Sequence, residues 1–284
     1  MPKMIAARPP KRKPKLGQHF LSSESHALAI VEALGDISAS TVLEIGPGGG
    51  ALTSLLARRA RRLIAVELDR VLTAQLRLQF GMSRNVEILE ADILGVDFES
   101  LLGPRPGTTS PGLEHAVEPA KVVGNLPYFI TSDILLRLFA NCRHFSVLVL
   151  MVQREVADRI VAEPGGSEYG LLSATVQLYG RVEKVLDVPR GAFSPPPSVD
   201  SAVLRITLHP QFDELKVESK AFIAFLQRSF AQKRKTLWNN LREHYDEKNL
   251  RGALQAAGVT TSARAETLSL QQNAAVFRAL IENA

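Results

Sequence analysis

Short runs of branched aliphatic residues alternate with amphipathic stretches between residues 41 and 151. The runs are rich in Val, Ile and Leu, as buried parallel strands are, and they occupy residues 41–45, 63–67, 86–89, 121–124 and 147–151. Most are separated by stretches with a helical spacing of apolar residues, at 51–60, 70–80 and 131–141. This order predicts an α/β fold with a doubly wound sheet, which binds its ligand at the carboxyl ends of the strands.

Two segments depart from this alternation. Residues 103–120 hold three Gly and three Pro within 103–112, and we expect a surface loop there, before the fourth strand. After residue 180, strand-like runs at 181–188 and 202–208 are separated by Ser194-Pro195-Pro196-Pro197. Two adjacent runs joined in this way are expected to add an antiparallel edge to the sheet.

The pattern becomes helical from about residue 216. One helical stripe is predicted from the spacing of Phe222, Leu226, Phe230, Leu237 and Leu241, and shorter helices from that of Leu250, Leu254, Leu268, Val276 and Leu280. We therefore expect a boundary near residue 210. The predicted organisation is a basic arm at 1–15, a ligand-binding domain at 16–210 and a small all-α domain at 211–284.

Composition restricts the class of protein. With 284 residues, 45% hydrophobic and 22% charged, the chain has the make-up of a soluble globular protein. The single cysteine, Cys142, excludes a disulfide framework, and the six histidines show no metal-ligand spacing. No apolar run approaches the roughly 18–20 residues of a membrane span, and the N-terminus lacks the apolar stretch of a secretory signal. We expect a cytoplasmic protein with no metal and no membrane.

Positive charge is concentrated at the start of the chain. The formal net charge is +5, yet residues 1–15 alone carry six basic side chains and no acidic one, namely Lys3, Arg8, Lys11, Arg12, Lys13 and Lys15. A basic, proline-containing arm on a nearly neutral body suggests contact with a polyanion. A disordered solubilising tail is the alternative, and the composition does not separate the two.

A glycine-rich turn follows the first strand, in Glu44-Ile45-Gly46-Pro47-Gly48-Gly49-Gly50. Glycines allow a ligand to approach the backbone, and the next helix offers free N–H groups. The turn also satisfies the relaxed dinucleotide pattern, with Glu67 21 residues after Gly46, so NAD and S-adenosylmethionine are both candidates. Glu44 favours the cationic S-adenosylmethionine. Asp92 at the third strand end could accept from its adenine amine, and Glu67 from both ribose hydroxyls.

Residues 125–128, Asn125-Leu126-Pro127-Tyr128, suggest chemistry on an aromatic amine. The amine of adenine is a poor nucleophile because its lone pair is delocalised into the ring. Two acceptors on its N–H bonds, the Asn125 carboxamide oxygen and the Leu126 carbonyl, would draw it towards a tetrahedral form. Pro127 brings no competing donor, and Tyr128 offers a ring for base stacking.

With these motifs in order, the chain resembles the small-subunit (16S) ribosomal RNA adenine N6,N6-dimethyltransferases of the KsgA/RsmA type. The resemblance runs from about residue 13 to the C-terminus and rests on residues 15–21, 44–50, 66–69, 91–93, 125–128, 193–201 and 230–241. It implies a Rossmann-like class I methyltransferase sheet that binds S-adenosylmethionine through His19, Leu21, Gly46, Gly48, Glu67, Asp92 and Asn125. The 103–120 loop is longer than is usual in the family.

The resemblance also assigns the substrate residues. Asn125, Leu126 and Tyr128 form the catalytic tetrapeptide, and Phe193 is expected to sandwich the target base opposite Tyr128. RNA phosphates are expected at Arg228, Lys233, Arg234 and Lys235. The clustered arginines at 58, 59, 61 and 62 are a weaker case, because a helix C-terminus favours cations anyway.

By this resemblance the substrate is 16S rRNA of the (pre-)30S subunit, dimethylated by a monomer at two adjacent adenosines of the 3′-terminal hairpin loop. The nearest alternative is the erythromycin-resistance type, which shares the chemistry but acts on 23S rRNA; Leu126 and residues 233–241 favour the small-subunit form. A DNA adenine methyltransferase is a weaker alternative, because this chain shows no separate region for DNA recognition. Two alternatives come from other functional classes. One is a ribosome assembly factor that uses methylation as a checkpoint, and the more remote one is an NAD-dependent oxidoreductase.

Overall fold

The computed structural model describes residues 19–103 and 118–282. The basic arm at 1–15 and most of the 103–120 loop lie outside the described residues. Within them, no helix is long and apolar enough to cross a membrane.

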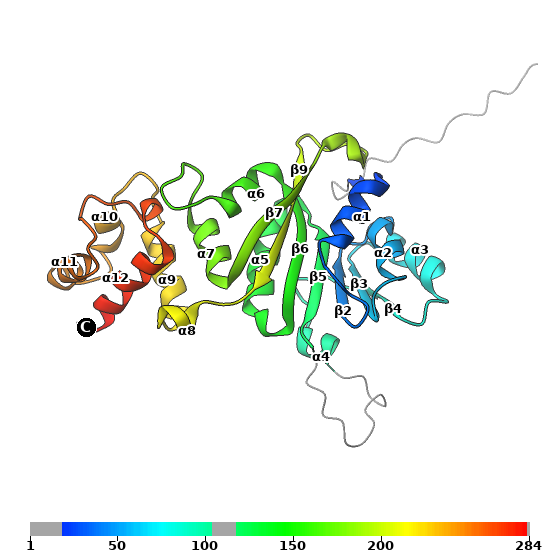
Figure 1. The fold of residues 1–284 in the computed structure, drawn as a ribbon, viewed down its shortest axis with the longest axis horizontal. Coiled ribbons are helices and arrows are strands. Elements are labelled where there is room, and N and C mark those ends of the chain that lie inside the picture. Colours follow the sequence, from blue (N-terminus) through cyan, green and yellow to red (C-terminus); the bar gives the residue numbers. More distant parts are fainter. Residues whose placement is uncertain (1–18, 104–117, 283–284) are drawn as a thin grey trace, which may run out of the picture.

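A seven-stranded sheet forms the centre of the molecule, with strand order β4-β3-β2-β5-β6-β9-β7 (Figure 1). The pairs among β2 to β6 are parallel, whereas β9 is antiparallel to both β6 and β7. The strands are β2 (Thr41–Ile45), β3 (Arg62–Glu67), β4 (Val86–Glu90), β5 (Ala120–Asn125), β6 (Phe145–Gln153), β7 (Gly180–Val188) and β9 (Ser201–Leu208). The doubly wound α/β prediction is confirmed. The antiparallel addition is confirmed too, with β9 inside the sheet and β7 at its edge.

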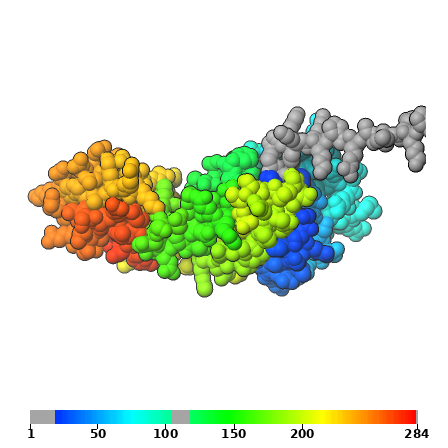
Figure 2. All heavy atoms as spheres, turned by 90° about the horizontal axis from the view of Figure 1, so that it is seen from above, coloured from blue at the N-terminus to red at the C-terminus, as the bar shows by residue number. Residues whose placement is uncertain are grey.

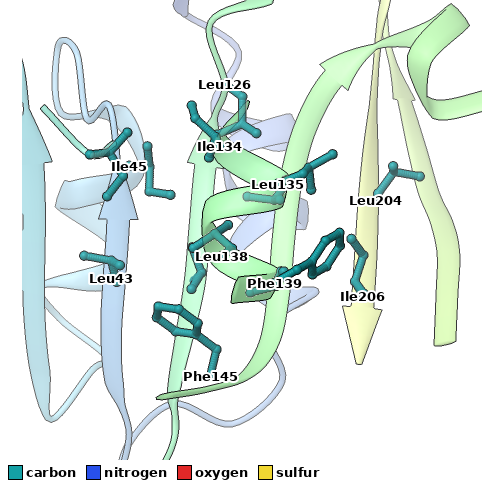
Figure 3. Close-up of a cluster of buried hydrophobic side chains, with 14 of the residues drawn as sticks. Leu43, Ile45, Leu126, Ile134, Leu135, Leu138, Phe139, Phe145, Leu204 and Ile206 are labelled. Carbon is teal, nitrogen blue, oxygen red and sulfur yellow. The ribbon is translucent and has the colours of Figure 1, made fainter. Parts of the chain in front are cut away.

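Helices cover both faces of this sheet because successive strand side chains point to opposite sides. Val42 packs with α1 (Glu24–Glu32) and α2 (Ala51–Leu56) in one buried cluster. Its neighbour Leu43 packs in another, with α4 (Phe98–Leu102), α5 (Thr131–Ala140), α6 (Arg154–Val161) and α7 (Leu171–Tyr179). Figure 3 shows Leu43 and Ile45 on the same side of the sheet as Leu135, Leu138 and Phe139 of α5.

Local capping explains why the helix at 70–80 was predictable to the residue. The Asp69 carboxylate accepts hydrogen bonds from the backbone N–H groups of Val71 and Leu72, at 2.8 and 3.2 Å, and so starts α3 (Arg70–Phe80). The helix at 51–60 is shorter than predicted, because α2 ends at Leu56.

The C-terminal segment contains α8 (Phe212–Leu215), α9 (Ser219–Ser229), α10 (Leu237–Leu241), α11 (Glu247–Ala256) and α12 (Leu270–Glu282). The prediction of one helical stripe from Phe222 to Leu241 is therefore wrong. The chain leaves the helix after Ser229, and the Thr236 hydroxyl starts α10 by accepting from the Asn239 N–H at 3.2 Å. Leu268 precedes α12 instead of lying in it. The helices of the C-terminal segment form one end of the elongated molecule (Figure 2).

The helical segment has its own buried core, which also takes in residues from before position 210. Phe222, Phe225 and Leu250 are fully buried there together with Tyr169 and Leu178 from the α6–α7 region. The predicted boundary near 210 thus falls where the sheet ends, but the helices beyond it pack on α7.

Candidate active site

The glycine-rich turn after β2 adopts a backbone that glycine alone accepts readily. Gly46, Gly48 and Gly50 have φ angles of 64°, 56° and 82°, in the left-handed region. At Gly48 a Cβ atom would also lie 2.9 Å from the Phe20 ring. The turn is therefore shaped both by its own conformation and by the segment around Phe20 that packs over it.

Glu67 is held in one orientation at the end of β3. Its Oε2 atom accepts from the Gly48 N–H at 3.0 Å, and its Oε1 atom accepts from the Asp69 N–H at 2.9 Å. Each carboxylate oxygen retains a further lone pair. The side chain is 5% exposed, so few other groups compete for it.

Asp92 lies at the same edge of the sheet. The Ala91 N–H donates to the Glu67 carbonyl at 3.0 Å, which continues the β3–β4 pairing as far as Asp92. One Asp92 oxygen accepts from the Leu94 N–H at 2.9 Å, and the side chain is exposed. The structure therefore brings Gly46, Gly48, Glu67 and Asp92 together at the carboxyl ends of three neighbouring strands.

Glu44 does not take the role expected of it. Its side chain is 1% exposed and accepts from the Thr53 hydroxyl at 2.8 Å, beneath α2. Burial raises the pKa of Glu44 from its ordinary value of 4.5 to about 8, so the carboxyl is mostly neutral at pH 7. A buried, neutral acid cannot select a cationic cofactor by its charge.

The tetrapeptide begins at the last residue of β5. The Asn125 Nδ2 group donates to the His19 carbonyl at 3.1 Å. Because that bond uses the amide nitrogen, the Oδ1 atom is left as an acceptor. The Leu126 side chain is buried at 1% exposure, and its carbonyl accepts no hydrogen bond from another described residue. Both acceptors that the amine chemistry requires are thus available.

Tyr128 is anchored by its hydroxyl, which lies 2.8 Å from the Ser201 Oγ atom at the start of β9. The residue opens a short 3-10 turn, Tyr128–Ile130, and is half-buried. Its ring is nearly parallel to that of His19, with centroids 6.3 Å apart and planes at 23°.

The N-terminal segment joins the two substrate motifs. In the pair of short strands β1 (Phe20–Leu21) and β8 (Phe193–Ser194), Leu21 lies opposite Phe193. The His19 Nδ1 atom is 2.9 Å from the Pro195 carbonyl. The Leu21 side chain is only 9% exposed and packs in the core with α1, so a contact with the cofactor would have to involve its backbone.

Phe193, the residue expected to sandwich the target base opposite Tyr128, is buried in this structure, and the sandwich itself stays a prediction. The Phe193 ring is 4% exposed and belongs to the core cluster that contains Leu21 and Val203. Pairing with β1 turns this side chain into the core, which gives it the apolar packing that any phenylalanine favours. As placed, it presents no free face to a base.

Three of the four basic residues predicted to contact RNA lie on a turn, whereas Arg228 lies in the last turn of α9. Lys233, Arg234 and Lys235 are exposed between α9 and α10. The Lys233 Nζ atom donates to the Ser167 carbonyl at 2.5 Å, whereas Arg228 lies over the Tyr245 ring at 5.8 Å. Their contact with RNA stays a prediction.

Comparison with known proteins identifies the family. The family model described as ribosomal RNA adenine dimethylase matches residues 10–282. The chain belongs to this family. It is therefore an enzyme that dimethylates adenine in ribosomal RNA, and its cofactor is S-adenosylmethionine.

Individual relatives of this rRNA adenine dimethylase cover nearly its whole length. A ribosomal RNA small subunit methyltransferase A from Koribacter versatilis (strain Ellin345) is 53% identical over 282 residues, which is 99% of each chain. One from Synechococcus elongatus is 41% identical over 268 residues, 93% of this chain and 92% of the relative. The crystal structure of the 23S rRNA methyltransferase ErmE matches with a TM-score of 0.67 at 27% identity, over 92% of this chain and 99% of that one.

The carboxyl edge of the dimethylase sheet fits the adenosyl part of the cofactor. An added Cβ at Gly49 would meet nothing within 4 Å, so the backbone of the turn is open to a ligand at that residue. The oriented Glu67 carboxylate suits a ribose diol, and the Asp92 carboxylate suits an adenine amine, because both groups are acceptors for N–H or O–H donors.

Two exposed apolar residues of the dimethylase were not identified from the sequence as part of the site. Leu68 is 58% exposed directly after Glu67, and Phe129 is 72% exposed directly after Tyr128. Their positions next to motif residues were the only signal, because exposure depends on how the neighbouring turns fold. Both offer apolar surface beside the site.

Proposed function

We propose that the enzyme dimethylates N6 of two adjacent adenosines in the 3′-terminal hairpin loop of 16S rRNA during small-subunit biogenesis. The observation that carries the chemistry is the bond between Asn125 and the His19 carbonyl, which leaves the carboxamide oxygen as an acceptor. The choice of RNA is supported by relatives such as that of Koribacter versatilis, whose name specifies the small subunit, at 53% identity against 27% for ErmE.

Gly46, Gly48, Glu67 and Asp92 would hold S-adenosylmethionine, with His19, the Leu21 backbone and Asn125 near its methionine end. When bound, this cofactor supplies a methyl group on a sulfonium, which reacts with nucleophiles. Glu67 would bind the ribose hydroxyls and Asp92 the adenine amine. Because two backbone N–H groups fix Glu67, it is preorganised and loses little entropy on binding.

Asn125 and Leu126 act on the amine of the target adenine. The Asn125 Oδ1 atom and the Leu126 carbonyl accept its two N–H bonds and localise its lone pair for attack. No strong base is needed, because N6 becomes acidic once it is alkylated and can release a proton to water. Catalysis then depends on position and on the two acceptors.

The RNA outside the active site would contact Arg228, Lys233, Arg234 and Lys235, whose exposed cations can neutralise phosphates. We propose that the protein acts as a monomer on the (pre-)30S particle in the cytoplasm. An additional role as an assembly factor, with methylation as its checkpoint, is compatible with this target.

The test supplies methyl-labelled S-adenosylmethionine with unmethylated small-subunit particles and, separately, with 23S rRNA. We expect label at the two adjacent adenosines of the small-subunit RNA. Label in 23S rRNA alone would move the enzyme to the erythromycin-resistance type. Binding of particles without any label transfer would favour the assembly role.

A further inference from the structure

Phe129 is the only exposed residue among the twelve phenylalanines of the chain. All twelve lie within the described residues, and the other eleven are buried or half-buried. The Phe129 side chain is 72% exposed and belongs to none of the three buried apolar clusters. A phenylalanine ring left in water forgoes the gain of burial, so a ligand that covered this ring would bind with favourable free energy.

The turn that carries Phe129 is held on both sides. The Pro127 carbonyl accepts from the Ile130 N–H at 3.2 Å and from the Thr131 hydroxyl at 3.2 Å. The Ile130 side chain packs against the core cluster below. The Phe129 ring is therefore presented to solvent by a turn with fixed neighbours, and it is not part of a loose loop.

Phe129 follows Tyr128 directly in the 3-10 turn Tyr128–Ile130. Such a turn has three residues, so the two side chains leave the backbone about 120° apart. The Tyr128 hydroxyl reaches the buried Ser201, 2.8 Å away, whereas Phe129 faces solvent. The two rings therefore cannot cover the same base. Phe129 offers a second aromatic surface, next to the target base that is expected at Tyr128.

The proposed substrate supplies a second base at this place. When one of the two adjacent adenosines enters the site, the other is joined to it by a single phosphodiester. A base that leaves its stack deprives its neighbour of a stacking partner on one side. An exposed aromatic ring beside the site can take the place of that partner, since every base has a π face.

We propose that Phe129 stacks on the other of the two adjacent adenosines while the first is held for methylation. This inference rests on the proposed function, because it takes the adenosine pair as the substrate. Tyr128 and Phe193 keep their expected roles at the target base. Phe129 adds an RNA contact outside the amine site and favours a purine beside the target.

The first test measures methyl transfer to unmethylated small-subunit particles by the full chain. Phe129→Ala should raise the KM for the particles about 5- to 100-fold, the scale for one base–ring contact, with little change in kcat because the ring does not touch the amine. Phe129→Trp, which keeps a ring, should restore the wild-type KM. Phe129→Leu, which keeps apolar surface without a ring, should restore little of it.

The matched control is Leu136→Ala, which removes a 52% exposed apolar side chain from α5, the helix that follows the turn. It should behave as wild type. Thermal melts and S-adenosylmethionine titrations should be unchanged for every variant, because an exposed side chain contributes little to folding.

The second test detects the stacked base. Small-subunit particles carry 2-aminopurine in place of one of the two adenosines. This fluorescent purine lacks the 6-amino group, so only the remaining adenosine is a methyl acceptor and the probe occupies the neighbouring position. Stacking on a ring quenches the probe. We expect saturating wild-type enzyme and Phe129→Trp to quench it, and Phe129→Ala and Phe129→Leu to quench it much less.

Each other result has a distinct meaning. A wild-type KM for Phe129→Ala, or equal quenching by this variant and the wild type, would overturn the inference and leave the proposed function intact. Full rescue by Phe129→Leu would overturn it in favour of an apolar contact with a protein of the particle. A lower melting temperature or weaker cofactor binding by Phe129→Ala would overturn it in favour of a structural role. Failure of the wild-type enzyme to methylate the particles would refute the proposed function itself.

Discussion

The side-chain amide of Asn125 donates a hydrogen bond to the backbone carbonyl of His19 across 3.1 Å. The two residues are 106 positions apart in the chain, so only the folded structure can make this contact. The reverse orientation would set two oxygens against each other, and the bond therefore decides which end of the carboxamide faces the substrate. A residue near the N-terminus thus orients the carboxamide of the proposed catalytic residue.

Replacing Asn125 by Ala should lower turnover by about 10²-fold or more, because one transition-state acceptor is lost. Methyl transfer to small-subunit particles under saturating RNA and cofactor measures the effect. Cofactor affinity, measured by calorimetry on the same variant, should change much less. Near-full turnover of Asn125→Ala would show that the amine is activated in another way.

Glu67→Gln should weaken S-adenosylmethionine binding by at least about 10-fold, the scale for losing one hydrogen bond to a charged group. Both Glu67 oxygens accept from backbone N–H groups, and an amide must turn its NH₂ towards one of these donors. Isothermal titration measures the affinity. Glu90 lies opposite Glu67 in the β3–β4 pairing and is exposed, so Glu90→Gln is the matched control and should bind normally.

Gly48→Ala should reduce both stability and cofactor binding. The new Cβ would lie 2.9 Å from the Phe20 ring, at a φ of 56°, and such a backbone conformation costs a non-glycine residue about 1–3 kcal/mol. Gly49→Ala is the control in the same turn, because a Cβ there meets nothing within 4 Å. Thermal melts and titration compare the two. Equal behaviour of both variants would contradict the packing of Phe20 on this turn.

Glu44→Gln should make the protein more stable than wild type at neutral and alkaline pH. The unfolded carboxyl loses its proton near pH 4.5, but the folded one retains it to about pH 8. The free energy of unfolding of the wild type therefore falls as pH rises through this window, by at most about 1.4 kcal/mol per unit from this group, and levels off above it. The glutamine variant lacks this slope.

Denaturant titrations of both proteins from pH 4 to pH 9 measure the difference. Below the unfolded pKa the two should agree, since both side chains are then neutral in both states. A constant difference at every pH would mean that Glu44 is ionised in the folded protein.

Arg234→Ala combined with Lys235→Ala should weaken RNA binding and its salt dependence. If each cation neutralises one phosphate, the slope of log affinity against log salt should become shallower by about 1.5 in total. Lys233 is left in place because it also donates to Ser167. The double variant Arg58→Ala and Arg59→Ala removes two exposed cations elsewhere and should leave the slope nearly unchanged. Equal losses in both would indicate general charge attraction only.

Much of the fold follows from local patterns. The strands at 41–45, 63–67 and 121–124 were predictable because buried parallel strands need unbroken branched aliphatic residues. The helix at 70–80 is started by its own neighbour, Asp69. The tetrapeptide at 125–128 and the glycine-rich turn at 46–50 likewise depend on residue types with restricted or unusual backbone freedom. Such features require no distant partner.

The stripe from Phe222 to Leu241 shows where local reasoning fails. Its apolar spacing suits one helix, yet the chain breaks at 230–236 and each half packs separately on the same core. Periodicity records which side chains are buried, but it does not record a break between two helices that bury the same face.

The sequence by itself determined the sheet, the glycine-rich turn and the tetrapeptide, because each of them follows from the backbone preferences and apolar character of its own residues. Tertiary structure alone decided that Glu44 and Phe193 are buried and that His19 lies against Asn125 and Tyr128. The placement of Phe193 and His19 depends on the pairing of β1 with β8, which joins segments more than 170 residues apart, whereas Glu44 is buried by the packing of α2 over β2. Burial and ring placement follow from such long-range contacts, and residue type does not encode them locally.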